Sequence, residues 1–219
     1  MNKKIVFSLV IGFTLAGCGR LPLLDTIINP AAKADGNGSY LADDFSDEDS
    51  GWDTFTHTEG SAYYEDNAFL ITVQAPNADL FSIFPRIFIN SEIHVRASRV
   101  DGSENNNYGI VCRYQDPENF YAGQISSDGY AGIFMMEDGT YKLLGRKFMV
   151  RSDSVLGGSG ENLIQFVCDE DQLVLSVNGE AVDRHEDDTF RSGETGVIAG
   201  TVDGDFGKFR FDDYSVVTR

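Results

Sequence analysis

Short runs of alternating apolar and polar residues, separated by turn dipeptides, fill the chain from Tyr40 onward. The turn dipeptides join Asp or Asn to glycine, and these residues tolerate the positive φ angles of tight hairpins. They are Asp128-Gly129, Asp138-Gly139, Asn178-Gly179 and Asp203-Gly204. No stretch has a convincing helical period. The pattern predicts an all-β, mostly antiparallel domain, larger than one immunoglobulin-like sandwich and typical of a two-sheet β-sandwich.

The turn at Asp128-Gly129 predicts the register at the centre of the domain. A two-residue loop would pair Ile125 with Gly132 and turn both toward the core, so the neighbouring residues on each strand would face outward. The same alternation in the segment SEIHVRASRV turns its polar residues away from the core. We therefore predict one sheet face that gathers His94, Arg96, Arg113, Gln124 and Met135.

This predicted face is our candidate ligand site. Arg and Gln offer planar or bidentate hydrogen bonds, and Met135 adds apolar surface for the C–H face of a sugar ring. The alternative interpretation is an ordinary solvated sheet face, whose polar residues follow from alternation alone.

Two cysteines, Cys112 and Cys168, lie in the strand-like segments YGIVCRY and LIQFVCDE. In an exported protein thiols oxidise, so a disulfide between them is one expectation. Two separately buried thiols are the other, because sequence does not show how closely their Cα atoms approach.

The first residues have a short basic region and an apolar run from Ile5 to Ala16, too short to span a bilayer comfortably and typical of a secretion signal. Its end, LAGC, resembles the lipobox of bacterial lipoproteins. The resemblance implies a signal peptide over 1–17, an acylated Cys18 that starts a tether over 18–39, and a domain over 40–219 held at the cell membrane or outer membrane. The alternative is an ordinary signal peptide with a chance cysteine.

The charge of the chain limits its partners. There are 35 acidic and 17 basic residues, a formal net charge of −18. Such a surface repels phosphate backbones, so we expect no nucleic-acid partner. Divalent cations and neutral or cationic ligands fit better.

Four segments in order, DDFSDEDSGW, YGIVCRYQDPENFYAGQISSDGYAGI, LIQFVCDEDQLVLSVNGE and FRFDDYSVV, resemble the concanavalin A-like lectin and glucanase superfamily. The nearest likeness is to its laminin-G-like and 3-keto-disaccharide-hydrolase-like domains. The resemblance implies a jelly roll whose inner sheet commonly receives carbohydrate. The architecture also hosts enzymes and structural modules, so a glycoside- or keto-sugar-acting hydrolase and a cell-surface interaction module without a small ligand remain alternatives.

The resemblance bears on metal binding and catalysis as well. In such jelly rolls the first and last strands commonly lie side by side and hold a structural calcium. Carried over to this chain, the resemblance implies that Asp43, Asp44, Asp212 and Asp213 supply the calcium ligands. The alternative is that one Asp of each pair caps a turn while the other faces water. The Glu-x-Asp-x-x-Glu motif of the superfamily's glucanases does not occur. We therefore predict no catalytic residues.

Overall fold

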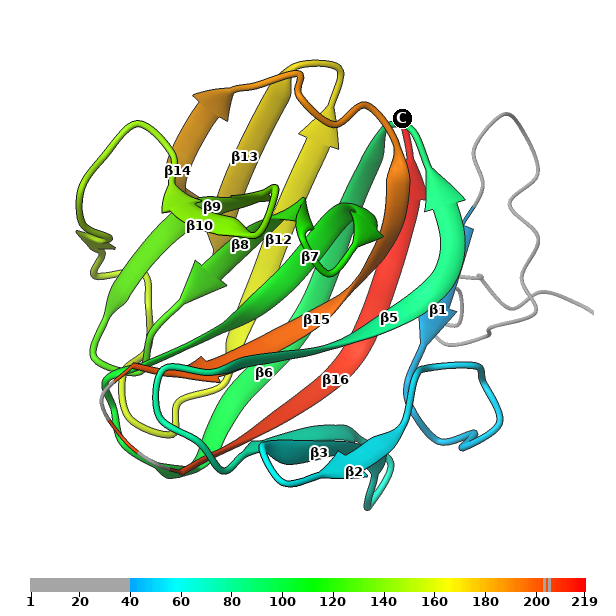
Figure 1. Cartoon of the computed structure of the whole chain (residues 1–219), viewed down its shortest axis with the longest axis vertical. Helices are drawn as coiled ribbons and strands as arrows, with labels where there is room; N and C mark the ends of the chain where they lie inside the picture. Colours follow the sequence, from blue (N-terminus) through cyan, green and yellow to red (C-terminus); the bar gives the residue numbers. More distant parts are fainter. Residues whose placement is uncertain (1–39, 203, 205) are drawn as a thin grey trace, which may run out of the picture.

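The computed structural model describes residues 40–202, 204 and 206–219 of the chain. The predicted signal peptide, the tether and Cys18 lie outside these residues. Two antiparallel sheets pack face to face (Figure 1). This confirms the predicted all-β sandwich, and no described residue is helical.

The larger sheet has nine strands, and every pairing in it is antiparallel. Its order is β14 (Glu180–Glu186), β13 (Gln172–Val177), β12 (Asn162–Asp169), β6 (Ser91–Gly102), β16 (Gly207–Thr218), β4 (Phe69–Val73), β3 (Gly60–Tyr64) and β2 (Phe55–His57), with β1 (Tyr40–Asp43) beside β16. The first and last strands are therefore neighbours, with Asp43 opposite Tyr214.

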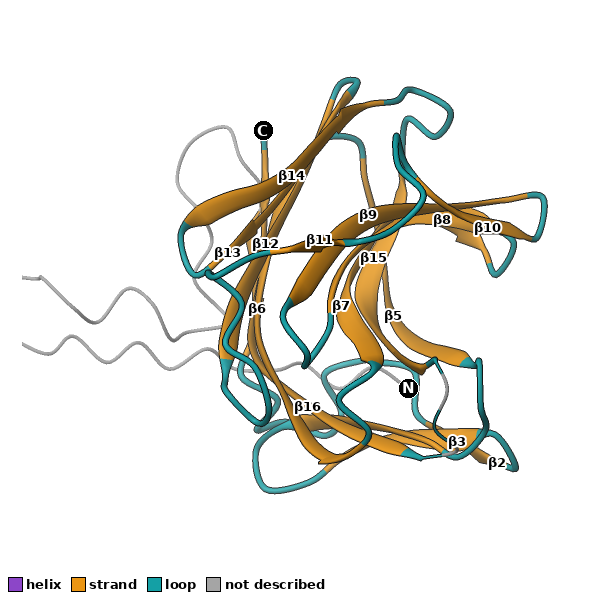
Figure 2. Ribbon diagram, turned by 90° about the vertical axis from the view of Figure 1, so that its left-hand side faces the viewer, coloured by secondary structure: helices purple, strands orange, loops and turns teal. Residues whose placement is uncertain are grey.

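The smaller sheet has seven strands. Its order is β10 (Thr140–Leu143), β9 (Tyr130–Glu137), β8 (Asn119–Ile125), β7 (Asn106–Asp116), β15 (Gly193–Thr201) and β5 (Asp79–Phe88), with β11 (Val150–Arg151) beside β9. Figure 2 shows this sheet bending, so that the face turned away from the larger sheet is concave. We call this surface the outward face.

Apolar side chains from both sheets fill the space between them. The aromatic residues Phe45, Phe211 and Tyr214, close to the meeting of the first and last strands, are at most 1% exposed. The Trp52 ring packs edge-on against Tyr214, with ring centroids 4.7 Å apart. Burial of such large rings is a major source of the sandwich's stability.

A disulfide joins Cys112 on β7 to Cys168 on β12, with Cα atoms 6.8 Å apart. It confirms the first of the two expectations for these cysteines. Because β7 and β12 belong to different sheets, the bond links the two layers of the sandwich through the core.

The predicted register of the central hairpin is wrong by one residue. Ile125 pairs with Ala131 rather than with Gly132. The cause is a three-residue loop, closed by a hydrogen bond from the Gly129 amide to the Ser126 carbonyl, with Gly129 at a φ of 96°. One residue of slip reverses every side chain of a strand. Met135 therefore lies in the core, 2% exposed, and not on the outward face.

Candidate functional site

The outward face of the smaller sheet is rich in aromatic residues. Phe81 on β5 lies 5.4 Å from Tyr114 on β7 between ring centroids, and both rings are partly exposed. Farther across the sheet, Phe134 and Tyr141 stack in parallel with centroids 4.9 Å apart. These rings cover a second, smaller apolar cluster formed by Ile83, Val111, Phe120, Ala122 and Ile198.

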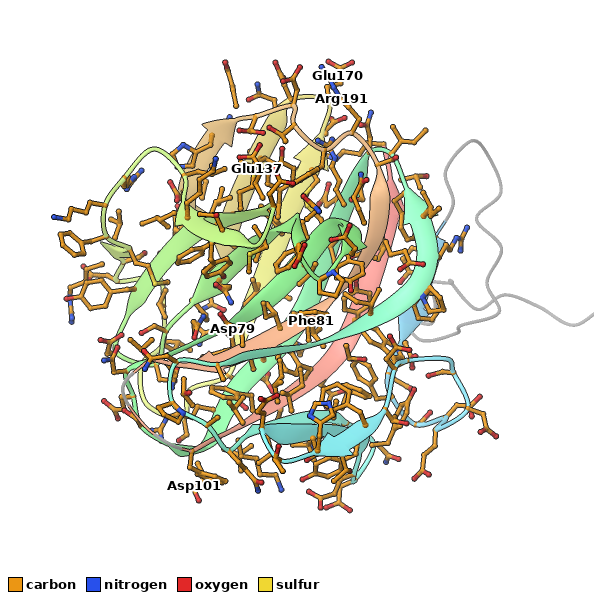
Figure 3. All side chains as sticks on the ribbon, viewed as in Figure 1. Asp79, Phe81, Asp101, Glu137, Glu170 and Arg191 are labelled. Carbon is orange, nitrogen blue, oxygen red and sulfur yellow. A yellow bond between two sulfur atoms is a disulfide. The ribbon has the colours of Figure 1, made fainter. Side chains whose placement is uncertain are left out.

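Polar residues lie among these rings. Leu80 and Tyr108 face the core, so alternation turns Asp79 of β5 and Asn107 of β7 outward. The Asn107 amide nitrogen donates to Asp79 Oδ1 at 2.8 Å. On β8, Gln124 accepts a hydrogen bond at Oε1 from the Tyr141 hydroxyl. Figure 3 shows Asp79 and Phe81 on the face turned toward the viewer.

Two amide atoms of this group have no hydrogen-bond partner although they are buried: Asn107 Oδ1 and Gln124 Nε2. The orientation of the Asn107 amide is set by Asp79, because the reverse orientation would place oxygen against oxygen. Either orientation of Gln124 leaves one of its two polar atoms unpaired, since Tyr141 contacts only the other. An unpaired buried polar group costs about 1–3 kcal/mol, and a polar molecule that reached either atom would supply the missing hydrogen bond.

Glycine makes the approach of Asp79 and Asn107 possible. Gly200 of β15 lies between them in the register, opposite Asp79 on one side and Asn107 on the other. A Cβ atom at this position would lie 1.9 Å from Asp79 Oδ1, 2.7 Å from Asn107 Oδ1 and 2.8 Å from the Ala78 carbonyl oxygen. Only glycine fits there, and three oxygen atoms converge above it.

The charge of Asp79 dominates this part of the face. Its side chain is exposed at the surface of the curved sheet, yet the protein around it removes part of its water shell and raises the pKa of the carboxyl, against the opposing effect of the Asn107 hydrogen bond. Burial, then the negative charge of Asp79, raise the pKa of Tyr141 well above its usual value. No ion pair joins Asp79 to a basic residue within the described part of the chain.

The structure does not bring the five predicted ligand-binding residues together. Gln124 lies on the outward face of the smaller sheet, but His94 and Arg96 lie on β6 in the other sheet. There His94 hydrogen bonds to Glu92 at 3.1 Å, and Arg96 contacts Asp213 and Glu161. The prediction assumed that the alternating segments shared one sheet, whereas the chain crosses between sheets from β6 to β7.

Arg113 is a second correction. It lies at an irregularity in the pairing of β7, with a φ of 51°, and is only 2% exposed. An extra residue in a strand interrupts alternation. The guanidinium donates to the Phe190 carbonyl through Nη1 at 2.9 Å, beside core residues. Tyr114, the next residue, takes a place on the outward face instead.

The four aspartates predicted to hold calcium have other partners. Asp43 is buried and accepts the Trp52 indole N–H at 2.9 Å and the Phe45 amide at 2.8 Å. Asp44 accepts from the Ser46 amide and hydroxyl. Asp212 and Asp213 pair with Arg210 and Arg96 respectively. Within residues 40–202, 204 and 206–219, no group of three His, Cys, Asp or Glu side chains is arranged to hold a metal.

Asp79 and Asn107 were missed by sequence reasoning. Both occur in turn-rich segments, NADLF and NNYG, where Asn and Asp ordinarily indicate loops. The available signal was alternation: each lies directly before a core residue of a strand, Leu80 or Tyr108. Alternation does not show, however, that both strands pair with β15, which lies far along the chain.

The part of the chain with described coordinates has no helix of the length and apolar character needed to cross a bilayer. By sequence, the chain matches no family model and no curated protein.

Solved structures share the fold. A carbohydrate-binding module, CBM66, from Bacillus subtilis is 14% identical with a TM-score of 0.55, over 78% of this chain and 93% of that one. A protein of unknown function with a galectin-like fold, also from Bacillus subtilis, is 10% identical with a TM-score of 0.58, over 82% and 96%. The GH43 protein BlXynB from Bacillus licheniformis is 16% identical with a TM-score of 0.61, over 81% of this chain but only 39% of its own. At these identities the likeness establishes that the chain has the β-sandwich fold of galectin-like and carbohydrate-binding domains.

Proposed function

We propose that this protein binds carbohydrate on the outward face of its seven-stranded sheet. One observation carries the proposal: buried amide atoms of Asn107 and Gln124 lack partners on the face that also carries partly exposed aromatic rings. Sugars present hydroxyl groups that both donate and accept, together with apolar C–H faces. Apolar sites with a few well-placed polar groups are the usual form of small-molecule sites.

Side chains at the surface would control access to these atoms. Gln124 is fully buried and touches the Tyr141 hydroxyl, while Asn107 touches the exposed Asp79 carboxylate. Binding then requires Tyr141 and Asp79 to shift and exchange their amide contacts for contacts with the ligand. The related fold of a carbohydrate-binding module supports this function, although the fold alone does not determine it.

The spacing of Asp79 and Glu194 on the outward face does not fit glycoside hydrolysis. Glycosidases commonly use two carboxyl groups about 5–9.5 Å apart. Asp79 and Glu194 both face outward, but Glu194 is six residues from Gly200, the partner of Asp79 on β15. At about 3.3 Å per residue the two are about 20 Å apart. We therefore propose binding rather than a reaction.

A glycan array probed with the full chain tests this function. Phe81→Ala removes a partly exposed ring, and Gln124→Ala removes a buried amide. For the glycans that the wild type binds, each variant should show an affinity about tenfold weaker. Gln165→Ala is the matched control, because Gln165 lies on β12 of the larger sheet and bonds to Glu92. Wild-type binding by both test variants, with thermal melting showing that they are folded, would disprove the site.

We also propose that the protein is an exported lipoprotein, anchored by acylated Cys18, with carbohydrate as its partner at the cell surface. The LAGC segment behind the apolar run supports this proposal. Each buried CH₂ of an acyl chain contributes about 0.8 kcal/mol to membrane binding. Cys18→Ser should move the protein from the membrane fraction to the soluble fraction, and retention in the membrane would disprove the anchor.

A further inference from the structure

The corner formed by Asp79, Asn107 and the Ala78 carbonyl is rich in hydrogen-bond acceptors. The three oxygen atoms that converge above Gly200 are a carboxylate oxygen, an amide oxygen and a main-chain carbonyl oxygen. Asn107 is 8% exposed, and its Oδ1 has no partner. Asn107 Nδ2 donates one hydrogen bond to Asp79 Oδ1, and the Ala78 carbonyl accepts one from the Thr201 amide.

A ligand group that suits this corner donates several hydrogen bonds. A hydroxyl donates one, whereas a protonated amine has three N–H donors and a positive charge. The charge matters here because Asp79 forms no ion pair with a described basic residue, as set out above. Charge-assisted hydrogen bonds are roughly twice as strong as neutral ones.

We propose that the ligand is an amino sugar with a free amine, and that its ammonium group binds Asp79 and Asn107 while its ring lies on the aromatic part of the outward face. This inference rests on the proposed function and specifies its ligand class. The exposed Asp79 side chain turns toward the ammonium and uncovers Asn107 Oδ1, which becomes a second acceptor. An N-acetylated sugar has one neutral N–H in place of three charged donors, so it loses the charge-assisted bond to Asp79 and cannot donate to both acceptors.

The surroundings of the corner favour a cation. Burial, then the negative charge of Asp79, raise the pKa of Tyr141, so this neighbour adds no negative charge that would compete for a cation. Burial also raises the pKa of Asp79, and only the Asn107 hydrogen bond opposes that rise. A bound ammonium supplies that stabilisation.

Calorimetric titration of the full chain at about pH 6, where aliphatic amines are protonated, tests the inference. The probes are three β-1,4-linked pentamers, of glucosamine, of N-acetylglucosamine and of glucose. We expect the glucosamine pentamer to bind about tenfold more tightly than either neutral one. Asp79→Asn should remove this advantage and leave the affinity for the neutral pentamers within a factor of about two.

Asp213→Asn is the matched control. It makes the same substitution and the same change in net charge on the opposite sheet, where Asp213 is exposed and pairs with Arg96. Equal losses in Asp79→Asn and Asp213→Asn would show general attraction of a polycation to an acidic protein and would overturn the inference.

The remaining outcomes separate this inference from the proposed function. Equal binding of all three pentamers would overturn the amino-sugar assignment and leave carbohydrate binding intact. Binding of pentalysine with the same dependence on Asp79 would assign the corner to a peptide ammonium and overturn the sugar. If no saccharide binds, on this titration or on the glycan array, both proposals fail.

Discussion

The Arg113 guanidinium is buried with Nε and Nη2 unpaired, which makes it a costly group for the folded protein. Burial lowers its pKa, as expected when a cation loses water without a close anion. Replacing a poorly paired buried charge by an apolar side chain of similar volume is often stabilising. We predict that Arg113→Met raises the free energy of unfolding by about 1 kcal/mol in urea titrations and leaves glycan binding unchanged. A loss of stability of that size would show that the guanidinium is better paired than the structure indicates.

Asp79 should affect stability in a pH-dependent way. Its folded-state pKa is raised, so the folded protein holds this proton at pH values where the unfolded chain has already released it. Stability from this group is therefore full below the ordinary pKa near 4 and is lost as pH rises through the raised value. We predict that Asp79→Asn raises the melting temperature at pH 7 relative to the wild type, with a smaller difference at pH 3.5. The opposite ordering in differential scanning calorimetry would contradict the raised pKa.

The bond between β7 and β12 is the main covalent contribution to stability at the scale of elements. Cys112 and Cys168 are 56 residues apart, and closing a loop of that length in the unfolded chain contributes about 4 kcal/mol in the chain-entropy model. We predict that the Cys112→Ala/Cys168→Ala double variant has a free energy of unfolding lower by about that amount and therefore unfolds at a lower guanidinium concentration. Reduced wild type should behave like the variant; if both match the oxidised protein, the bond does not hold the layers together.

The junction of β1 and β16 brings two pairs of aspartates to neighbouring strands, and N–H groups and arginines compensate their charge. Calcium at this junction remains a prediction from the sequence. Because the carboxylates already have partners, we expect a chelator such as EDTA to leave the melting temperature unchanged. A fall that added calcium reverses would establish the metal site.

Two irregular elements explain why the binding face was only partly predictable. Alternation correctly placed Ile125 in the core, because β8 pairs regularly with β7 and β9 at this position. The three-residue loop before β9 reversed Met135, and the irregularity in β7 buried Arg113. Asp-Gly is compatible with loops of either length, so the dipeptide alone does not fix which residues face outward.

For the whole molecule, the sandwich followed from turn signals and short alternating runs, because these are local properties of the sequence. The meeting of the chain ends agreed with what the family resemblance implied. The disulfide was one of two expectations, and the sequence did not decide between them because it does not show how closely the Cα atoms approach. The corner at Gly200 needed the pairing of β5 and β7 with β15, contacts between distant segments that single-sequence patterns do not specify.

The central claim is that carbohydrate binds the outward face of the smaller sheet. Amide chemical-shift mapping by NMR, with a glycan that the array identifies added to the full chain, tests it most directly. We predict that the largest shifts fall on Asp79, Phe81, Asn107, Gln124 and Gly200, which share that face, and that His94 and Arg96 are unaffected. Shifts concentrated on β6 around His94 and Arg96, with none at Asn107 or Gly200, would contradict the account.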